Sequence, residues 1–208
     1  MFSALRHATL SLLLAVVMIA PASADPRLAE GTTLVENLVE RIQTVVAAEP
    51  TPEEVRAETN AIIDEFFDYN TIARFAAGQA WRKATDAEKA EYKLAFREVL
   101  LSLAETQFEQ FRTLEYTSKD AVAKGNKLIV ASGMVHDITG KYPDSVVSWR
   151  ISTRPGKPIK IIDIEVENIS MLITQQQENT AIIRQNGGKF QALIDALKEQ
   201  AQSIKTAE

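Results

Sequence analysis

The sequence predicts an α+β fold in which helices come first, three or four antiparallel strands follow, and helices return at the end. Hydrophobic residues recur every three or four positions up to about residue 111 and again from residue 169, which is the period of an amphipathic helix. Between residues 118 and 166 they alternate with polar residues, which is the period of a strand. Glycine and proline turns separate the strands, so we expect a meander.

The helices before residue 80 have recognisable boundaries. Apolar residues at helical spacing cover about 28–48, and a proline-containing break follows. Thr51 is placed to cap a second helix, with Pro52 at its first position and Glu54 as the acid of a capping box. A short third helix is expected to stop at Gly78.

The longest periodic run in the chain follows a second capping box, formed by Thr85 and Glu88. Its apolar and aromatic residues lie largely along one stripe over about 86–111. After the strands, helical spacing returns over 169–184, breaks at Gly187–Gly188 and then resumes.

The first 24 residues have the pattern of a secretory signal peptide. A short basic region, Met1–Arg6, precedes an apolar region, Thr9–Ala20, and a small-x-small cleavage pattern, Ala22–Ala24. About 12 apolar residues are too few to span a bilayer, so we predict cleavage after Ala24 and an exported product with no integral membrane span. Residues 25–208 are expected to form a single domain, because no linker or repeat divides them.

Composition excludes several classes of function. The net charge is −5, and removing residues 1–24 takes away one basic and no acidic residue, so the exported chain is more acidic still. An acidic chain with scattered Lys and Arg lacks the basic footprint that nucleic-acid binding needs. The chain has no cysteine, so a thiol nucleophile and a disulfide framework are excluded.

Few residues are suited to catalysis. His136 is the one histidine left after the signal peptide, and its place beside a turn predicts a solvated side chain. No metal-ligand spacing surrounds it, so neither a metal nor a cofactor is expected. Asp163 and Glu165 alternate with apolar residues, which places both carboxylates on the outer face of the sheet. An isomerase-like enzyme would instead need Asp163 to face a cavity as a general base.

After catalytic and metal-binding residues, the remaining feature that could form a functional site is apolar surface. The long helix presents an aromatic stripe, and the strands present alternating apolar residues opposite it. Periodicity alone does not distinguish a packed core from a ligand cavity. If there is a cavity, the residues expected to line it are Phe75, Phe96, Leu100, Val130, Trp149, Ile151, Ile162 and Ile164.

Several motifs closely resemble the MlaC family, also called the toluene-tolerance auxiliary family. They are Phe67–Gly78, Trp81–Thr85 with Phe96–Arg97, and Ile161–Ser170, followed by Ile182–Ile183, Gly187–Gly188 and Leu193–Ile194. The resemblance spans about 32–197. Two positions depart from the family pattern: Asn168 stands where Gly is common, and Ile159 stands where Trp is common.

The resemblance implies a helical layer on a curved antiparallel sheet of about four strands, somewhat like nuclear-transport-factor-2 domains, with an internal hydrophobic cavity. It implies a periplasmic phospholipid carrier that exchanges lipid with an inner-membrane ABC transporter complex and an outer-membrane lipoprotein–porin complex, which supports outer-membrane asymmetry. A sister branch is linked to hopanoid transport. A periplasmic adaptor that carries no lipid is the further alternative.

Transfer of a carried lipid requires part of the protein to meet a partner or a head group. Lys141, Lys157 and Lys160 flank two turns of the meander, together with Arg154. We expect these side chains to form a basic end of the sheet that contacts anionic head groups or an acidic partner.

Overall fold

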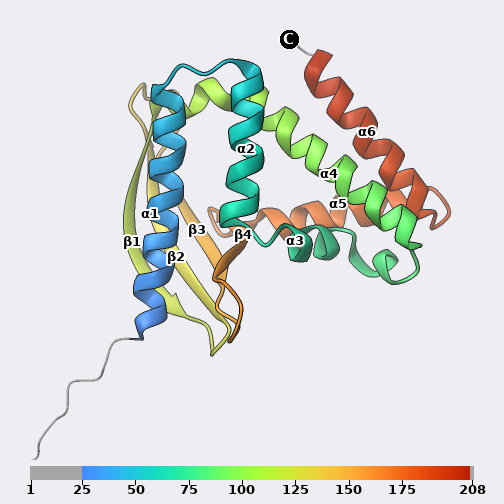
Figure 1. Cartoon of the computed structure of the whole chain (residues 1–208), viewed down its shortest axis with the longest axis horizontal. Helices are drawn as coiled ribbons and strands as arrows, with labels where there is room; N and C mark the ends of the chain where they lie inside the picture. Colours follow the sequence, from blue (N-terminus) through green and yellow to red (C-terminus); the bar gives the residue numbers. More distant parts are fainter. Residues whose placement is uncertain (1–24, 207–208) are drawn as a thin grey trace, which may run out of the picture.

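The computed structural model describes residues 25–206, so the predicted signal peptide and its cleavage site lie outside the described residues. Six α-helices and an open five-stranded sheet make up this part of the chain, and the α+β prediction is confirmed (Figure 1). The helices are α1 (Pro26–Ala47), α2 (Pro52–Phe66), α3 (Tyr69–Ala76), α4 (Asp86–Gln107), α5 (Met171–Gln185) and α6 (Phe190–Thr206), with 3-10 helices η1 (Gly78–Arg82) and η2 (Phe108–Thr113).

The strands β1 (Leu114–Ala123), β2 (Leu128–Asp137), β3 (Ser145–Ser152), β4 (Lys160–Val166) and β5 (Ile169–Ser170) pair in sequence order, and every pairing is antiparallel. The expected start of the first strand at residue 118 is too late, because Leu114 already pairs with Asp137. The sheet also gains a strand that the sequence assigned to a helix, since Ile169 pairs with Val166.

A tight turn explains that extra strand. Glu167 and Asn168 both have positive φ, at 49° and 64°, which is the geometry of the two-residue turns that connect hairpin strands. Asn tolerates this left-handed conformation better than most residues, so it replaces the expected Gly without loss of the turn. The chain then enters α5 directly, with Ser170 Oγ accepting a hydrogen bond from Ile173 N at 3.0 Å.

Both predicted capping boxes are present. Thr51 Oγ1 accepts from Glu54 N at 3.3 Å, and Thr85 Oγ1 accepts from Glu88 N at 3.2 Å, while each Glu carboxylate accepts from its cap residue's N–H. The long helix is shorter than its apolar stripe, because α4 ends at Gln107 and the chain tightens into η2.

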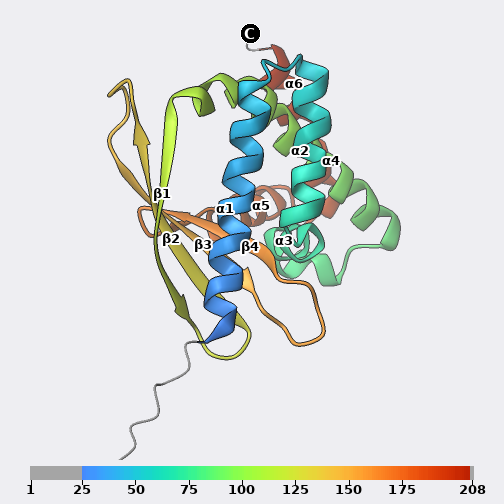
Figure 2. The same ribbon diagram turned by 60° about the vertical axis from the view of Figure 1, so that its left-hand side comes forward.

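The helices divide into two groups. Figure 2 shows α1 lying over the sheet, with α2 and α4 farther from β1. Gly31 permits the close approach of α1 to the sheet, since a Cβ at this position would overlap Ile129 Cδ1. A buried cluster of apolar residues from α1 and the sheet forms one core, with Val35, Leu38, Ile129, Ile151 and Ile161 at its centre.

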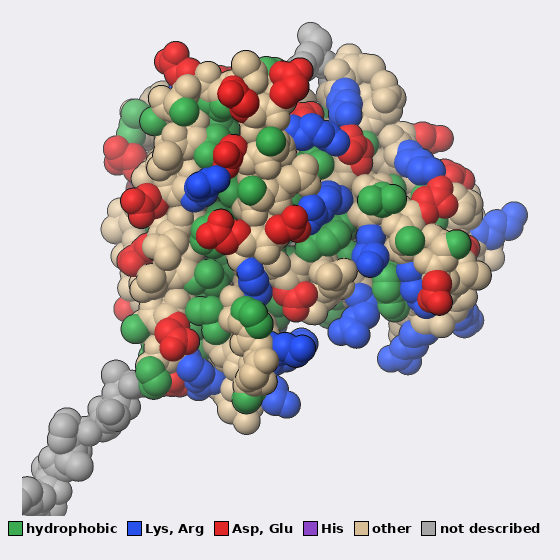
Figure 3. Space-filling view, viewed as in Figure 1, with side chains coloured by type: hydrophobic (Ala, Val, Ile, Leu, Met, Phe, Trp, Pro, Cys, Tyr) green, Lys and Arg blue, Asp and Glu red, His purple; other side chains and the backbone are tan. Residues whose placement is uncertain are grey.

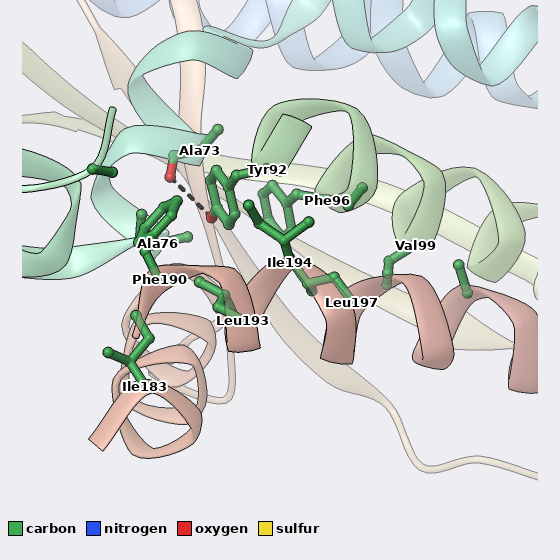
Figure 4. Packing of buried hydrophobic residues seen from close by; sticks show 14 residues of the cluster. Ala73, Ala76, Tyr92, Phe96, Val99, Ile183, Phe190, Leu193, Ile194 and Leu197 are labelled. Carbon is green, nitrogen blue, oxygen red and sulfur yellow. Dashed lines mark hydrogen bonds between the residues drawn. The ribbon is translucent and has the colours of Figure 1, made fainter. Parts of the chain in front are cut away.

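The second core lies among α3, α4, α5 and α6 (Figure 4). Tyr92 is completely buried there and stacks on Phe96 with ring centroids 5.8 Å apart. Its hydroxyl donates to the carbonyl of Ala73 at 3.0 Å, which joins α4 to α3. Burial raises the pKa of Tyr92 well above its ordinary value, so the hydroxyl stays protonated as a donor. Within residues 25–206, no helix is long and apolar enough to cross a membrane.

Candidate functional site

An apolar pocket of about 310 Å³ lies between α1, η2 and one face of the sheet. Val39 and Ile42 contribute from α1, and Phe111 contributes from η2. The strands supply most of the opposite wall, and the wall residues are mainly aliphatic or aromatic. These wall residues are Leu114, Glu115, Tyr116, Val135, Ser145, Val147, Trp149, Ile164 and Val166.

A second apolar pocket, of about 180 Å³, lies between α3, α4, β4 and the start of α5. Phe67, Ile72, Phe96, Leu100, Ile162, Asp163, Ile164, Met171, Leu172 and Gln175 line it. Ile164 lines this pocket and the larger one as well. The two pockets therefore meet at one aliphatic side chain, that of Ile164.

Gly133 creates room for an aromatic wall in the larger pocket. A Cβ at Gly133 would overlap the ring of Tyr116, so this ring lies directly over the β2 backbone. Tyr116 also packs edge to face on Trp149, with ring centroids 6.4 Å apart. Burial raises the pKa of the Tyr116 hydroxyl. Among the described residues, neither this hydroxyl nor Trp149 Nε1 has a hydrogen-bond partner, although both atoms are buried.

Five of the eight predicted lining residues line these pockets. Phe96, Leu100 and Ile162 face the smaller pocket, Trp149 faces the larger one, and Ile164 faces both. Whether any of them contacts a ligand stays a prediction.

Three other predicted lining residues lie elsewhere. Ile151 is completely buried in the core beneath α1. Val130 pairs with Arg150 and alternates with the buried Ile129, so its side chain lies on the other face of the sheet. Phe75 is 43% exposed on α3.

Sequence reasoning missed the contribution of α1 and η2. Val39, Ile42 and Phe111 were recognised as apolar positions, but a helical period does not say which strands a helix covers. Tyr116 was missed because the first strand begins earlier than alternation suggested. The glycine at 133 was the available signal, since a glycine inside a strand often marks a close approach.

Asp163 departs from the expected solvated position. It pairs with Arg150, on the face opposite Trp149 and Ile164, as alternation predicted. It is only 6% exposed and lines the smaller pocket, so the expectation that it is solvated is wrong. Both of its oxygens are engaged: Oδ2 accepts from Ser170 Oγ at 2.6 Å, and Oδ1 accepts from Leu172 N at 3.0 Å. Arg150 Nη1 lies 3.6 Å from Oδ2. This carboxylate therefore fixes the start of α5 and pairs with a guanidinium, which leaves it poorly placed to accept a proton from a ligand.

The predicted basic end of the sheet is wrong as a single surface. Lys141 follows β2, whereas Lys157 and Lys160 follow β3, and consecutive turns of an antiparallel meander lie at opposite ends. Lys141 Nζ lies 5.0 Å from the centre of the Tyr142 ring. Lys160 Nζ donates to the carbonyl of Asp64 at 3.2 Å, at the end of α2.

The histidine at the β2–β3 turn has an acidic partner. His136 Nδ1 lies 2.6 Å from Asp144 Oδ1, and both side chains are more than half exposed. The hydrogen bond with this carboxylate, together with its charge, raises the pKa of His136. Within residues 25–206, no group of three or more His, Asp or Glu residues is placed to hold a metal ion.

The comparisons with known proteins agree with this architecture. A phospholipid-binding protein from Ralstonia solanacearum, solved in complex with a phospholipid, superposes with a TM-score of 0.69. The sequence identity is 16%, and the match covers 84% of this chain and 98% of the other, so the likeness is one of fold. The family model described as "MlaC protein" matches residues 32–199. The chain belongs to the MlaC family.

Proposed function

We propose that this protein is a periplasmic phospholipid carrier that holds acyl chains in the two adjoining apolar pockets. The observation that carries the proposal is the pair of apolar pockets meeting at Ile164, between the helices and the sheet. Membership of the MlaC family and the fold shared with a phospholipid-binding protein support the same ligand class. The acyl chains would contact Phe96, Leu100, Trp149 and Ile164, together with Ile42 and Phe111 on the helical side.

The energetics of lipid release give the mechanism. Two acyl chains carry roughly 30 methylenes, and exposing each costs about 0.8 kcal/mol, so release into water would cost on the order of 20 kcal/mol. Spontaneous release is then negligible on any useful timescale. A carrier of this kind must pass the lipid on while it is docked to a membrane or to another protein.

The proposed partners follow from the family. Lipid would pass between an outer-membrane lipoprotein–porin complex and an inner-membrane ABC transporter complex, and this traffic would support outer-membrane lipid asymmetry. The signal-peptide pattern of residues 1–24 is the sequence basis for placing the protein in the periplasm. The phosphate of the lipid can stay near solvent, so an acidic protein can carry an anionic lipid.

Native mass spectrometry of gently purified protein tests the proposal. The wild-type protein should carry phospholipid, and Leu100→Asp should carry much less, because a carboxylate in the wall of an apolar pocket opposes acyl-chain burial. Leu94→Asp is the matched control, since Leu94 lies on the same helix but is 72% exposed.

Three outcomes have different meanings. Selective lipid loss in Leu100→Asp, with a folded far-UV spectrum, supports the carrier. Equal lipid loss in both variants points to general destabilisation and contradicts the assignment of the pocket. A wild-type protein that never carries lipid, even after incubation with phospholipid vesicles, would favour a non-carrying adaptor. Identification of the bound species would also distinguish phospholipid from a hopanoid.

A further inference from the structure

A third hollow, of about 670 Å³, opens beside the smaller apolar pocket at the junction of α2 and α3. Phe67 lines both spaces. The backbone at this junction is attached to the sheet, since Asp68 N donates to the carbonyl of Ile161 at 2.9 Å. We call this space the basic hollow, and its walls are Asp64, Phe67, Asp68, Tyr69, Asn70, Thr71, Arg74, Trp81, Lys93, Ser152, Arg154, Lys157, Pro158 and Lys160.

The lining of the basic hollow has a net positive charge, opposite in sign to the net charge of the chain. Five cationic side chains and two carboxylates line it, whereas the chain as a whole has a net charge of −5. Figure 3 shows Lys and Arg side chains gathered along the lower edge of the molecule, near the β3–β4 turn and α3. Such a local excess of positive charge in a concave site attracts anions.

The two carboxylates already have partners. Asp64 forms an ion pair with Arg97, and this pairing lowers the pKa of Asp64. Asp68 Oδ1 accepts a hydrogen bond from Thr71 N at 3.0 Å, as the cap of α3. The negative charge in the hollow is therefore engaged in joining α2 to α4 and in capping α3.

Three of the cations have no such role. Among residues 25–206, the side chains of Arg74, Arg154 and Lys157 form neither a hydrogen bond nor an ion pair, in contrast to Lys160. Arg154 and Lys157 flank a tight turn, in which Lys157 N donates to the carbonyl of Arg154 at 3.1 Å. The turn and α3 thus present donors to the same hollow from two sides.

We propose that the basic hollow binds the phosphate of the phospholipid whose acyl chains occupy the adjoining apolar pockets. Arg74, Arg154 and Lys157 are the phosphate contacts, and Phe67 marks the passage from phosphate to acyl chains. The inference rests on the proposed function, because the phosphate of a lipid reaches the hollow only when its acyl chains occupy the apolar pockets. Guanidinium and ammonium groups suit phosphate oxygens, and among residues 25–206 these three side chains have no other partner.

A competition between two lipids tests the proposal. The full protein is incubated with equal amounts of dioleoylphosphatidic acid and dioleoylglycerol in the same detergent, and the bound ratio is read by native mass spectrometry. The two lipids share their acyl chains, so the ratio isolates the phosphate. The wild-type protein should prefer phosphatidic acid, and Arg154→Gln with Lys157→Gln should lower the bound ratio about fivefold, without loss of dioleoylglycerol binding.

The control variant is Lys119→Gln with Lys189→Gln, which removes the same charge from two exposed side chains outside the hollow and should leave the ratio unchanged. Excess inorganic phosphate should lower the ratio in the wild-type protein, because it competes for the same cations.

Five results would overturn the inference. A wild-type ratio near one means that the phosphate is not recognised, whereas binding of neither lipid means that the proposed function itself fails. An equal loss of both lipids in the hollow variant points to general destabilisation. Calorimetric binding of inorganic phosphate without any lipid preference assigns the hollow to the free anion. If the hollow variant keeps the wild-type ratio but takes up lipid from vesicles more slowly, the basic hollow is a docking surface for an acidic partner.

Discussion

Ile164 is the residue at which the space for acyl chains can be enlarged or closed without a change of charge. It lines both apolar pockets, and it is only partly buried. Ile164→Ala removes three carbon atoms, worth about 2.4 kcal/mol if fully buried at about 0.8 kcal/mol each. Because the side chain is only partly buried, we expect a loss of about 1–2 kcal/mol, or roughly 4 °C in Tm.

Ile164→Trp should destabilise the protein by a similar amount, about 1–3 kcal/mol, because overpacking strains the neighbouring side chains. The two variants should differ in lipid content. The alanine variant enlarges the space where the two pockets meet and should keep bound phospholipid, whereas the tryptophan variant fills that space and should lose most of it.

Urea unfolding gives the stability of each variant, and phosphorus analysis of extracted lipid gives its occupancy. If the two variants are equally stable but only the alanine variant keeps its lipid, the result supports acyl chains that lie against Ile164 and extend into both pockets. Equal lipid losses that follow the fall in stability would refute the reasoning, because occupancy would then depend on the integrity of the fold and not on space at this residue.

Three further predictions concern the frame of the site. Asn168→Ala should cost about 1 kcal/mol in urea unfolding, whereas Asn168→Gly should be nearly neutral, because φ here is 64°; equal effects would refute the strain argument. The pKa of His136, measured by NMR, should lie above 6.5 and should fall in Asp144→Asn. The pair stabilises the fold at low pH and ceases to do so as pH rises through that pKa. An unchanged pKa in the variant would refute the pairing. Tyr92→Phe should cost about 1 kcal/mol, because it removes one of the two donors to the carbonyl of Ala73, which then keeps only the hydrogen bond from Ala77 N; a neutral effect would show that the Tyr92 hydroxyl does not contribute to stability.

Local sequence signals determined the class of fold. Capping boxes at Thr51 and Thr85 depend on residues three positions apart, so they are readable without any tertiary contact. The change from helical to alternating period likewise reflects which face of each element is buried, and it placed the strands and helices within a few residues. Ile169–Ser170 was misassigned because a two-residue strand carries no period of its own.

The site depended on which elements meet, and that is decided by tertiary packing. Alternation separates Val130 from Ile129 but does not say which of the two faces α1. The role of Asp163 was likewise hidden, because its partners Ser170 and Leu172 are brought to it by the turn before α5.

Charge is the clearest case of this division. The sequence by itself established that the chain is acidic, that it has apolar helix and strand faces, and that it has no cysteine. Composition does not depend on conformation. Only the tertiary structure placed Lys141 and Lys157 at opposite ends of the sheet. It also brought Arg74 of α3 and Arg154 of the β3–β4 turn to the same hollow. Long-range packing places side chains that are distant in sequence around one hollow, and a local pattern carries no information about that distance.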